Sequence, residues 1–125
     1  MTSEERGGPL RLGTLEQQVM DVLWDQAPVS IRELIDSLGG THAYTTIATV
    51  LGNLERKRLV RPEKEGRSVR YAPRCTREMH AARLMEQALS TSNDRATSIL
   101  HFIHAIDPRD VQLLREYLAG REDDG

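Results

Sequence analysis

Hydrophobic positions in the first half of the chain recur every three or four residues, the spacing of one helical face. They predict helices over residues 16–26 and 31–38, then a third in the stretch 42–60. Thr14 with Gln17, and Ser30 with Glu33, have the spacing of N-terminal capping boxes. The apolar stripes comprise Leu15, Val19, Val22 and Leu23; Ile31, Leu34, Ile35 and Leu38; and Ile47, Val50, Leu51, Leu54 and the stem of Arg58.

The opposite face of the third helix carries short polar side chains where a solvated helix usually carries Glu and Lys. This face comprises Thr45, Thr49, Gly52, Asn53 and Arg56. Small hydroxyl and amide groups let a helix lie deep in the DNA major groove and touch base edges. The face therefore favours base reading, and the alternative is an ordinary amphipathic helix with incidental threonines.

Two short extended runs follow, over 59–63 and 69–73, around a charged turn at Lys64–Ser68. They predict a β-hairpin, and Pro62 and Pro73 restrict both strands to sheet edges or ends. Short helices joined by short turns and followed by a basic hairpin make a winged helix-turn-helix. The wing tip, Lys64–Arg70, would then lie along the phosphate backbone or minor groove, unless the hairpin only packs on the helices.

The second half predicts three further helices, over about 76–89, from Asn93 or Asp94 to Ile106, and from Pro108 to Gly120. About 50 residues cannot bury this many apolar groups against themselves. We expect a second copy to cover them across a two-fold axis, the alternative being a monomer that packs back on the wing domain. The predicted dimerisation residues are Met85, Leu89, Ile99, Leu100, Phe102, Ile103, Leu114, Tyr117 and Leu118.

The predicted fold is mainly α: an N-terminal winged helix-turn-helix with a small hairpin wing, then a three-helix C-terminal dimerisation domain. The predicted boundaries are a disordered segment at 1–10, the winged helix at 11–74, the dimerisation domain at 75–120 and a disordered tail at 121–125. Trp24 is expected in the core between the first helix and the wing.

The charge is unevenly distributed along the chain. The net charge is −2, yet residues 41–74 hold eight cations against three acids, a net +5, so the rest carries −7. A basic stripe on an acidic protein attracts phosphate in one place. The alternative is an ordinary solvated hairpin.

The remaining composition narrows the class of protein. Single Cys75 excludes an internal disulfide and fits a cytoplasmic location. At this position, between the two halves, a small junction residue is favoured over a redox switch. No apolar run approaches the roughly 20 residues of a membrane span, and the polar N-terminus lacks a signal-peptide core.

Three segments resemble the penicillinase repressor (BlaI/MecI) family in order and spacing. They are Leu12-Gly13-Thr14-Leu15-Glu16…Val19-Met20…Leu23-Trp24, then Ala43-Tyr44-Thr45-Thr46-Ile47-Ala48-Thr49-Val50-Leu51…Leu54…Lys57…Leu59-Val60, and Arg70-Tyr71-Ala72-Pro73. The resemblance implies a homodimeric repressor that binds double-stranded DNA at inverted repeats in promoters, often with TACA/TGTA half-sites.

The resemblance also implies residue roles. Thr45, Thr46 and Thr49 match base-reading positions, Tyr44 matches a position beside a phosphate, and Arg67 and Arg70 match wing contacts to the backbone. The full predicted DNA-binding set is Arg11, Tyr44, Thr45, Thr46, Thr49, Asn53, Arg56, Lys57, Arg67 and Arg70.

Family repression is typically lifted when a membrane sensor-protease detects a β-lactam and the repressor is cut in its dimerisation domain. The matching bond here is His101–Phe102. Well-known members have Asn before the cut bond, so His101 is a departure from the family pattern.

Other classes of protein are less well supported. The chain has no His-Glu-x-x-His, Gly-x-Ser-x-Gly or phosphate-cradling glycine loop, so we do not expect an enzyme or a cofactor. His80, His101 and His104 are the weak case for a Zn²⁺-sensing regulator, although the prediction is no metal site. A single cysteine argues against thiolate copper sensing. A small-molecule sensor with a ligand near the dimerisation helices is a second alternative, and an interior filled with aliphatic side chains argues against it. A purely structural interaction module is a third, and the basic stripe beside the Thr face argues against it.

Overall fold

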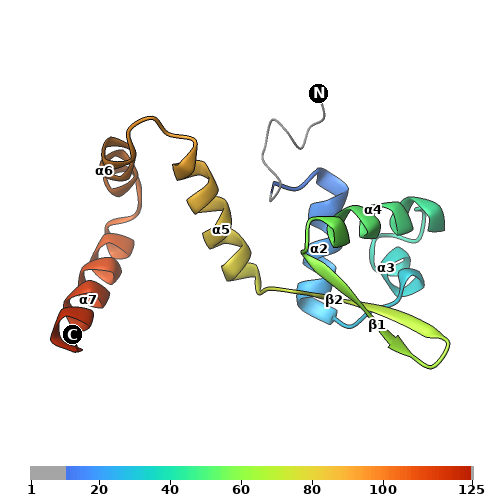
Figure 1. The fold of residues 1–125 in the computed structure, drawn as a ribbon. Helices are drawn as coiled ribbons and strands as arrows, with labels where there is room; N and C mark the ends of the chain where they lie inside the picture. Colours follow the sequence, from blue (N-terminus) through green and yellow to red (C-terminus); the bar gives the residue numbers. More distant parts are fainter. Residues whose placement is uncertain (1–10, 125) are drawn as a thin grey trace. The chain divides into compact units, whose positions relative to one another are not determined.

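The computed structural model describes residues 11–124, and the predictions for residues 1–10 and for residue 125 lie outside this range. In chain order the elements are α2 (Thr14–Gln26), α3 (Ile31–Ser37), α4 (Tyr44–Arg56), β1 (Val60–Glu65), β2 (Ser68–Pro73), α5 (Arg77–Ser90), α6 (Arg95–Ala105) and α7 (Pro108–Asp124) (Figure 1). Within residues 11–124, three helices, a two-stranded hairpin and three more helices confirm the predicted mainly α fold class.

Helix α2 begins one residue earlier than a Thr14 cap requires. Gly13 is the N-cap, and its amide donates to Oε1 of Glu16 at 2.9 Å. Gln17, the expected box partner, instead donates to Asp21 at 3.1 Å. The predicted Thr14 cap is therefore wrong, because Thr14 is already inside the helix and the carboxylate of Glu16 reaches back to the amide of Gly13, the residue that caps it.

Helix α3 begins at the predicted Ser30 cap and ends at Ser37, one residue before the predicted Leu38. The Ser30 hydroxyl accepts a hydrogen bond from the Glu33 amide at 3.2 Å. After Ser37 the chain enters left-handed backbone at Gly39 (φ 102°) and Gly40 (φ 79°), a conformation that glycine adopts without steric cost. The Gly40 amide donates to the carbonyl of Ile35 at 2.8 Å and closes the helix.

Helix α4 is shorter than its apolar pattern suggests. It ends at Arg56 with Lys57 as C-cap, and Arg58 follows in left-handed backbone (φ 63°). The prediction that the stem of Arg58 extends the buried stripe is wrong, because this turn leaves Arg58 exposed. The turn directs Leu59 and Val60, both 0% exposed, into the core instead.

The hairpin forms the predicted wing, with a tighter turn than expected. The strands pair antiparallel from Val60 opposite Pro73 to Glu65 opposite Ser68, so only Gly66 and Arg67 lie between them. The predicted five-residue turn is wrong because Gly66 (φ 62°) allows the chain to reverse in two residues. Two backbone hydrogen bonds between Val29 and Tyr71, of 3.0 and 2.8 Å, tie β2 to the chain after α2.

One aliphatic core holds this half together, and every buried hydrophobic residue within residues 11–124 lies between positions 19 and 75. Trp24 is half-buried against it and donates from Nε1 to the carbonyl of Cys75 at 2.9 Å. Trp24 therefore packs against the core from α2, at the point where the chain leaves β2. The buried set is Val19, Met20, Leu23, Val29, Ile31, Leu34, Ile47, Val50, Leu51, Leu54, Leu59, Val60, Ala72 and Cys75.

The described chain divides into two compact units, the first ending at Gln87 and the second beginning at Ala88. Most of α5 therefore belongs with the winged-helix unit, and the functional boundary at 74/75 stays a prediction. The hydroxyl of Thr76 caps α5 by accepting from the Met79 amide at 3.0 Å.

In the second unit, local signals define the helices. Asp94 caps α6, accepting from the Thr97 amide at 3.1 Å and the Thr97 hydroxyl at 2.7 Å, and these bonds lower the pKa of Asp94. Helix α7 continues to Asp124, so the predicted end at Gly120 and the disordered tail from Arg121 are wrong as far as Asp124. Glycine weakens a helix by roughly 1 kcal/mol but need not end it.

Candidate nucleic-acid interface

The short polar face of α4 is exposed, as the sequence predicts. Ile47, Val50, Leu51 and Leu54 turn into the core. The opposite side presents Tyr44, Thr45, Thr46, Thr49 and Gly52 to solvent, with Asn53 half-buried. A side chain built at Gly52 would meet nothing within 4 Å, so the face is open at its centre. The arrangement can present three hydroxyls and an amide to a groove of nucleic acid.

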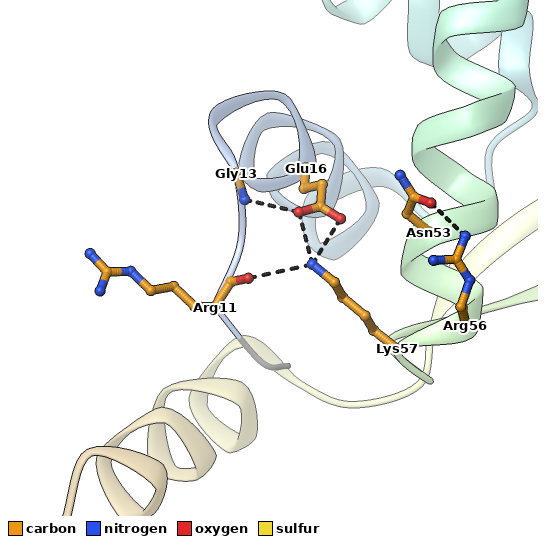
Figure 2. Close-up of polar contacts among 6 residues, drawn as sticks. All are labelled: Arg11, Gly13, Glu16, Asn53, Arg56 and Lys57. Carbon is orange, nitrogen blue, oxygen red and sulfur yellow. Dashed lines mark hydrogen bonds and ion pairs between the residues drawn. The ribbon is translucent and has the colours of Figure 1, made fainter. Parts of the chain in front are cut away.

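The far end of this face carries a positive charge. Nη2 of Arg56 donates to Oδ1 of Asn53 at 2.7 Å, which holds the exposed guanidinium against the helix surface (Figure 2). Because the bond fixes one donor of the fork, the remaining guanidinium donors are presented in a defined direction. A guanidinium offers five donors that match phosphate oxygens.

Lys57 lies differently from its neighbour Arg56. Its side chain is only 7% exposed, and Nζ lies 3.0 and 3.1 Å from the two carboxylate oxygens of Glu16. Nζ also donates to the carbonyl of Arg11 at 3.4 Å, while the Arg11 side chain points away from this cluster (Figure 2). The structure thus separates Lys57 from the exposed face on which Arg56 lies.

On the wing, the two arginines singled out by the sequence also differ. Arg67 is exposed at the turn. Arg70 is 37% exposed and pairs with Glu33 of α3 at 3.2 Å, with a longer 4.0 Å contact to Glu65. It also donates to the carbonyl of Pro28 at 3.3 Å. Arg70 therefore braces the wing against the helices, and any phosphate contact would compete with these bonds.

The set of site residues predicted from the sequence omits two acidic residues that form these contacts. Glu16 and Glu33 each orient a cation that the sequence assigns to DNA binding. Their positions in first helical turns were visible in the sequence, but their partners lie far along the chain.

Tyr71 of β2 is partly buried against the core, and this burial affects its hydroxyl. Burial raises the pKa of Tyr71, and the charge of Glu55 adds to the effect. The Tyr71 hydroxyl therefore stays neutral at physiological pH.

His80 is the one buried polar or charged residue in the described part of the chain. It is 4% exposed, its ring lies 5.6 Å from that of Trp24, and neither ring nitrogen has a hydrogen-bond partner. Burial lowers the pKa of His80, and the charge of Arg83 adds to the effect. The imidazole is therefore neutral at pH 7 and serves as a packing group.

The structure also bears on the ligand-sensing alternatives. Within residues 11–124, no group of three or more His, Cys, Asp or Glu residues could hold a metal ion. An open pocket of about 540 Å³ lies beside Trp24, lined otherwise by residues 73–79. It lies wholly in the first unit, at the junction after the wing.

The helices α2–α4 and the hairpin define a winged-helix DNA-binding fold. The penicillinase repressor family model matches residues 12–120, and the chain belongs to this family. The chain is 37% identical over 118 residues to the transcriptional regulator BlaI of Mycobacterium tuberculosis, covering 90% of this chain and 86% of that protein. It is thus a transcriptional repressor and not an enzyme, as predicted.

Two solved structures align with the chain. A MarR family protein from Bacillus stearothermophilus aligns with a TM-score of 0.51 at 14% identity, covering 97% of this chain and 83% of that one. At that identity the likeness concerns the fold alone. The solution structure of the DNA-binding domain of the repressor BlaI aligns over 54% of this chain and 84% of that one, at 30% identity and a TM-score of 0.48.

None of the helices within residues 11–124 is long and apolar enough to cross a bilayer.

Proposed function

We propose that this repressor binds double-stranded DNA as a homodimer, with α4 of each copy in the major groove of one half of an inverted repeat. The exposed Thr face of α4, closed at one end by Arg56, carries the proposal. Two-fold symmetric repressors read two-fold symmetric sites because each copy docks the same helix. The protein would act in the cytoplasm, beside its operator.

The state of the C-terminal unit supports the dimer. Helix α6 has no buried residue, and large apolar side chains of α6 and α7 are exposed in the single chain. Seven large apolar side chains exposed on two helices of one unit are typical of an association surface. The set is Ile99, Leu100, Phe102, Leu113, Leu114, Tyr117 and Leu118, with Met85 on α5 also exposed, and all but Leu113 belong to the dimerisation set named from the sequence.

Derepression would follow from loss of this dimer. The bond between His101 and Phe102 lies inside α6, and both residues are exposed. Cutting there would divide the helix that contributes Ile99, Leu100 and Phe102, and DNA affinity would fall because two half-sites are no longer linked by one body. A β-lactam signal through a sensor-protease is the proposed trigger. A repressor that stays intact on immunoblots while its target genes are induced would contradict this step.

The base-reading role is tested by selecting bound duplexes from a random-sequence library with the full chain. We expect an inverted repeat to emerge. Thr46→Ala should then weaken binding to the selected duplex about tenfold, with little change on a scrambled duplex, because a base contact and not a phosphate contact is lost. Thr91→Ala is the matched control, since Thr91 is an exposed threonine outside the winged helix whose hydroxyl donates to the nearby carbonyl of Ala88 at 2.7 Å.

Base reading by α4 would be contradicted if no sequence is enriched. It would also be contradicted if Thr46→Ala changes affinity by the same factor on the selected and the scrambled duplex. A change of affinity on adding Zn²⁺ or a chelator would favour the metal-sensing alternative.

A further inference from the structure

Lys57 is the C-cap of α4, yet its side chain turns into the protein. Nζ lies within 3.4 Å of three oxygens: both carboxylate oxygens of Glu16 and the carbonyl of Arg11. Glu16 in turn accepts from the amide of Gly13 at 2.9 Å. One ammonium group therefore joins the end of α4, the first turn of α2 and the segment that precedes α2 (Figure 2).

The burial of this ion pair opposes a direct phosphate contact. The Lys57 and Glu16 side chains are 7% and 14% exposed. To reach a phosphate, Lys57 would have to leave two charge-assisted hydrogen bonds and strand a largely enclosed carboxylate, which is costly. Arg56, one residue earlier, is exposed and has no such obstacle.

Arg11 has the complementary geometry. Its backbone is held by Lys57 through the carbonyl, while its guanidinium is exposed and points away from the ion pair (Figure 2). A cation fixed in advance beside a DNA-reading helix binds phosphate better than one on a loose segment, because the ordering entropy is not lost on binding.

We propose that Lys57 is a positioning residue, and that the Lys57–Glu16 pair fixes Arg11 so that its guanidinium contacts the DNA backbone. The inference rests on the proposed DNA-binding function and deepens it, because it assigns the phosphate contact to Arg11 and removes Lys57 from the residues that touch DNA. The ammonium group of Lys57 does not contact DNA. It holds the backbone of Arg11, whose guanidinium contacts a phosphate.

The test is DNA affinity as a function of salt for the full chain on its selected duplex. Each phosphate contact contributes about 0.9 to the slope of log affinity against log salt. Glu16→Gln is the decisive variant, because its amide oxygen still accepts from the Gly13 amide while the ion pair is lost. A positioning role predicts about three- to tenfold weaker binding and a shallower slope for Glu16→Gln, although a negative charge has been removed.

Double variants separate positioning from contact. Lys57→Met and Arg11→Gln should each cause the same loss as Glu16→Gln, and Arg11→Gln should add nothing in the Lys57→Met background. Arg56→Gln serves as the comparator for an exposed cation, and its effect should add to that of Lys57→Met.

The opposite pattern would overturn the inference. If Lys57 touches phosphate, Glu16→Gln would release it and leave binding unchanged or tighter, and the losses from Lys57→Met and Arg11→Gln would add. Absence of sequence-preferring binding by the wild-type chain would instead reject the proposed function itself, and the inference with it.

A second measurement separates loss of order at Arg11 from a general loss of stability in the variants. The NMR order parameter of the Arg11 amide should fall in Lys57→Met while the amides of α4 keep wild-type values. An Arg11 amide equally rigid in both proteins would contradict the positioning role.

Discussion

The two units of this chain contrast in how their apolar side chains are used. Among the residues that the structure describes, every buried hydrophobic residue lies between Val19 and Cys75. In the described part of the second unit no residue is buried, although it forms the helices α6 and α7. The same kind of amphipathic pattern thus forms a core in one half and an exposed apolar surface in the other.

The contrast indicates that one half is complete as a single chain and the other is not. Helical hydrogen bonds and caps define α6 and α7 locally, but most helical stability in proteins comes from packing an apolar face. The first unit supplies that packing internally. The second would obtain it from another copy, and this dependence would couple DNA binding to the state of the dimer.

The largest effect is expected from a substitution in the core of the first unit. Leu54→Ala removes a fully buried side chain at the centre of the winged-helix core. We expect a loss of about 2–5 kcal/mol in the free energy of unfolding, since a cavity remains. Urea unfolding monitored by circular dichroism measures it. Leu118→Ala, at a position 57% exposed in the single chain, should cost far less in dilute protein, and equal losses would contradict the contrast.

The next effect concerns the incomplete half. Phe102→Glu together with Leu118→Glu places charges on the exposed apolar faces of α6 and α7. We expect the dimer dissociation constant to rise by at least about a hundredfold, because unpaired charges would be buried in the interface. Analytical ultracentrifugation measures it, and a dimer of unchanged strength would place the interface elsewhere. Arg115→Glu, an exposed charge change on α7, is a control for net charge.

A smaller effect sharpens the account of the junction between wing and α5. Trp24→Phe keeps the aromatic ring near His80 and Arg77 but removes the Nε1 donor to the Cys75 carbonyl. We expect a loss of about 1 kcal/mol in the stability of the first unit, the usual value of a part-buried hydrogen bond. Urea unfolding checks it, and an unchanged midpoint would show that the bond contributes nothing.

The smallest effect is a dependence on pH. Because burial lowers the pKa of His80, protonation favours the unfolded state, where the imidazole has its ordinary value of about 6.5. The stabilising effect of a neutral His80 is complete above that pH and is lost as pH falls through the lower folded value. His80→Phe should therefore flatten the stability profile below pH 6.5. Parallel profiles for the wild type and the variant would contradict this.

Features with a short-range cause could be predicted from the sequence. The Ser30 cap, the glycine stop after α3 and the exposed Thr face of α4 depend on neighbours within one or two helical turns. The exposure of Ile99 and Leu114 was also foreseeable, because three short helices cannot enclose so many apolar groups.

Contacts between distant segments could not be predicted. Lys57 and Glu16 are 41 residues apart, so helical spacing gave no sign that Lys57 would be enclosed. Arg70 likewise lies in the segment that the sequence predicts as the wing, but its ion pair with Glu33 depends on how the hairpin packs on α3. The left-handed Arg58 arises because the chain must turn Leu59 into the core, a tertiary demand that local propensity does not show.

The most direct test of the central claim is the mass of the full chain, free and on its selected duplex, by sedimentation equilibrium. The account predicts a free species of twice the 14.1 kDa chain, and two copies on a duplex with an inverted repeat. A chain that stays monomeric at all concentrations, and binds the duplex as a single copy, would contradict it.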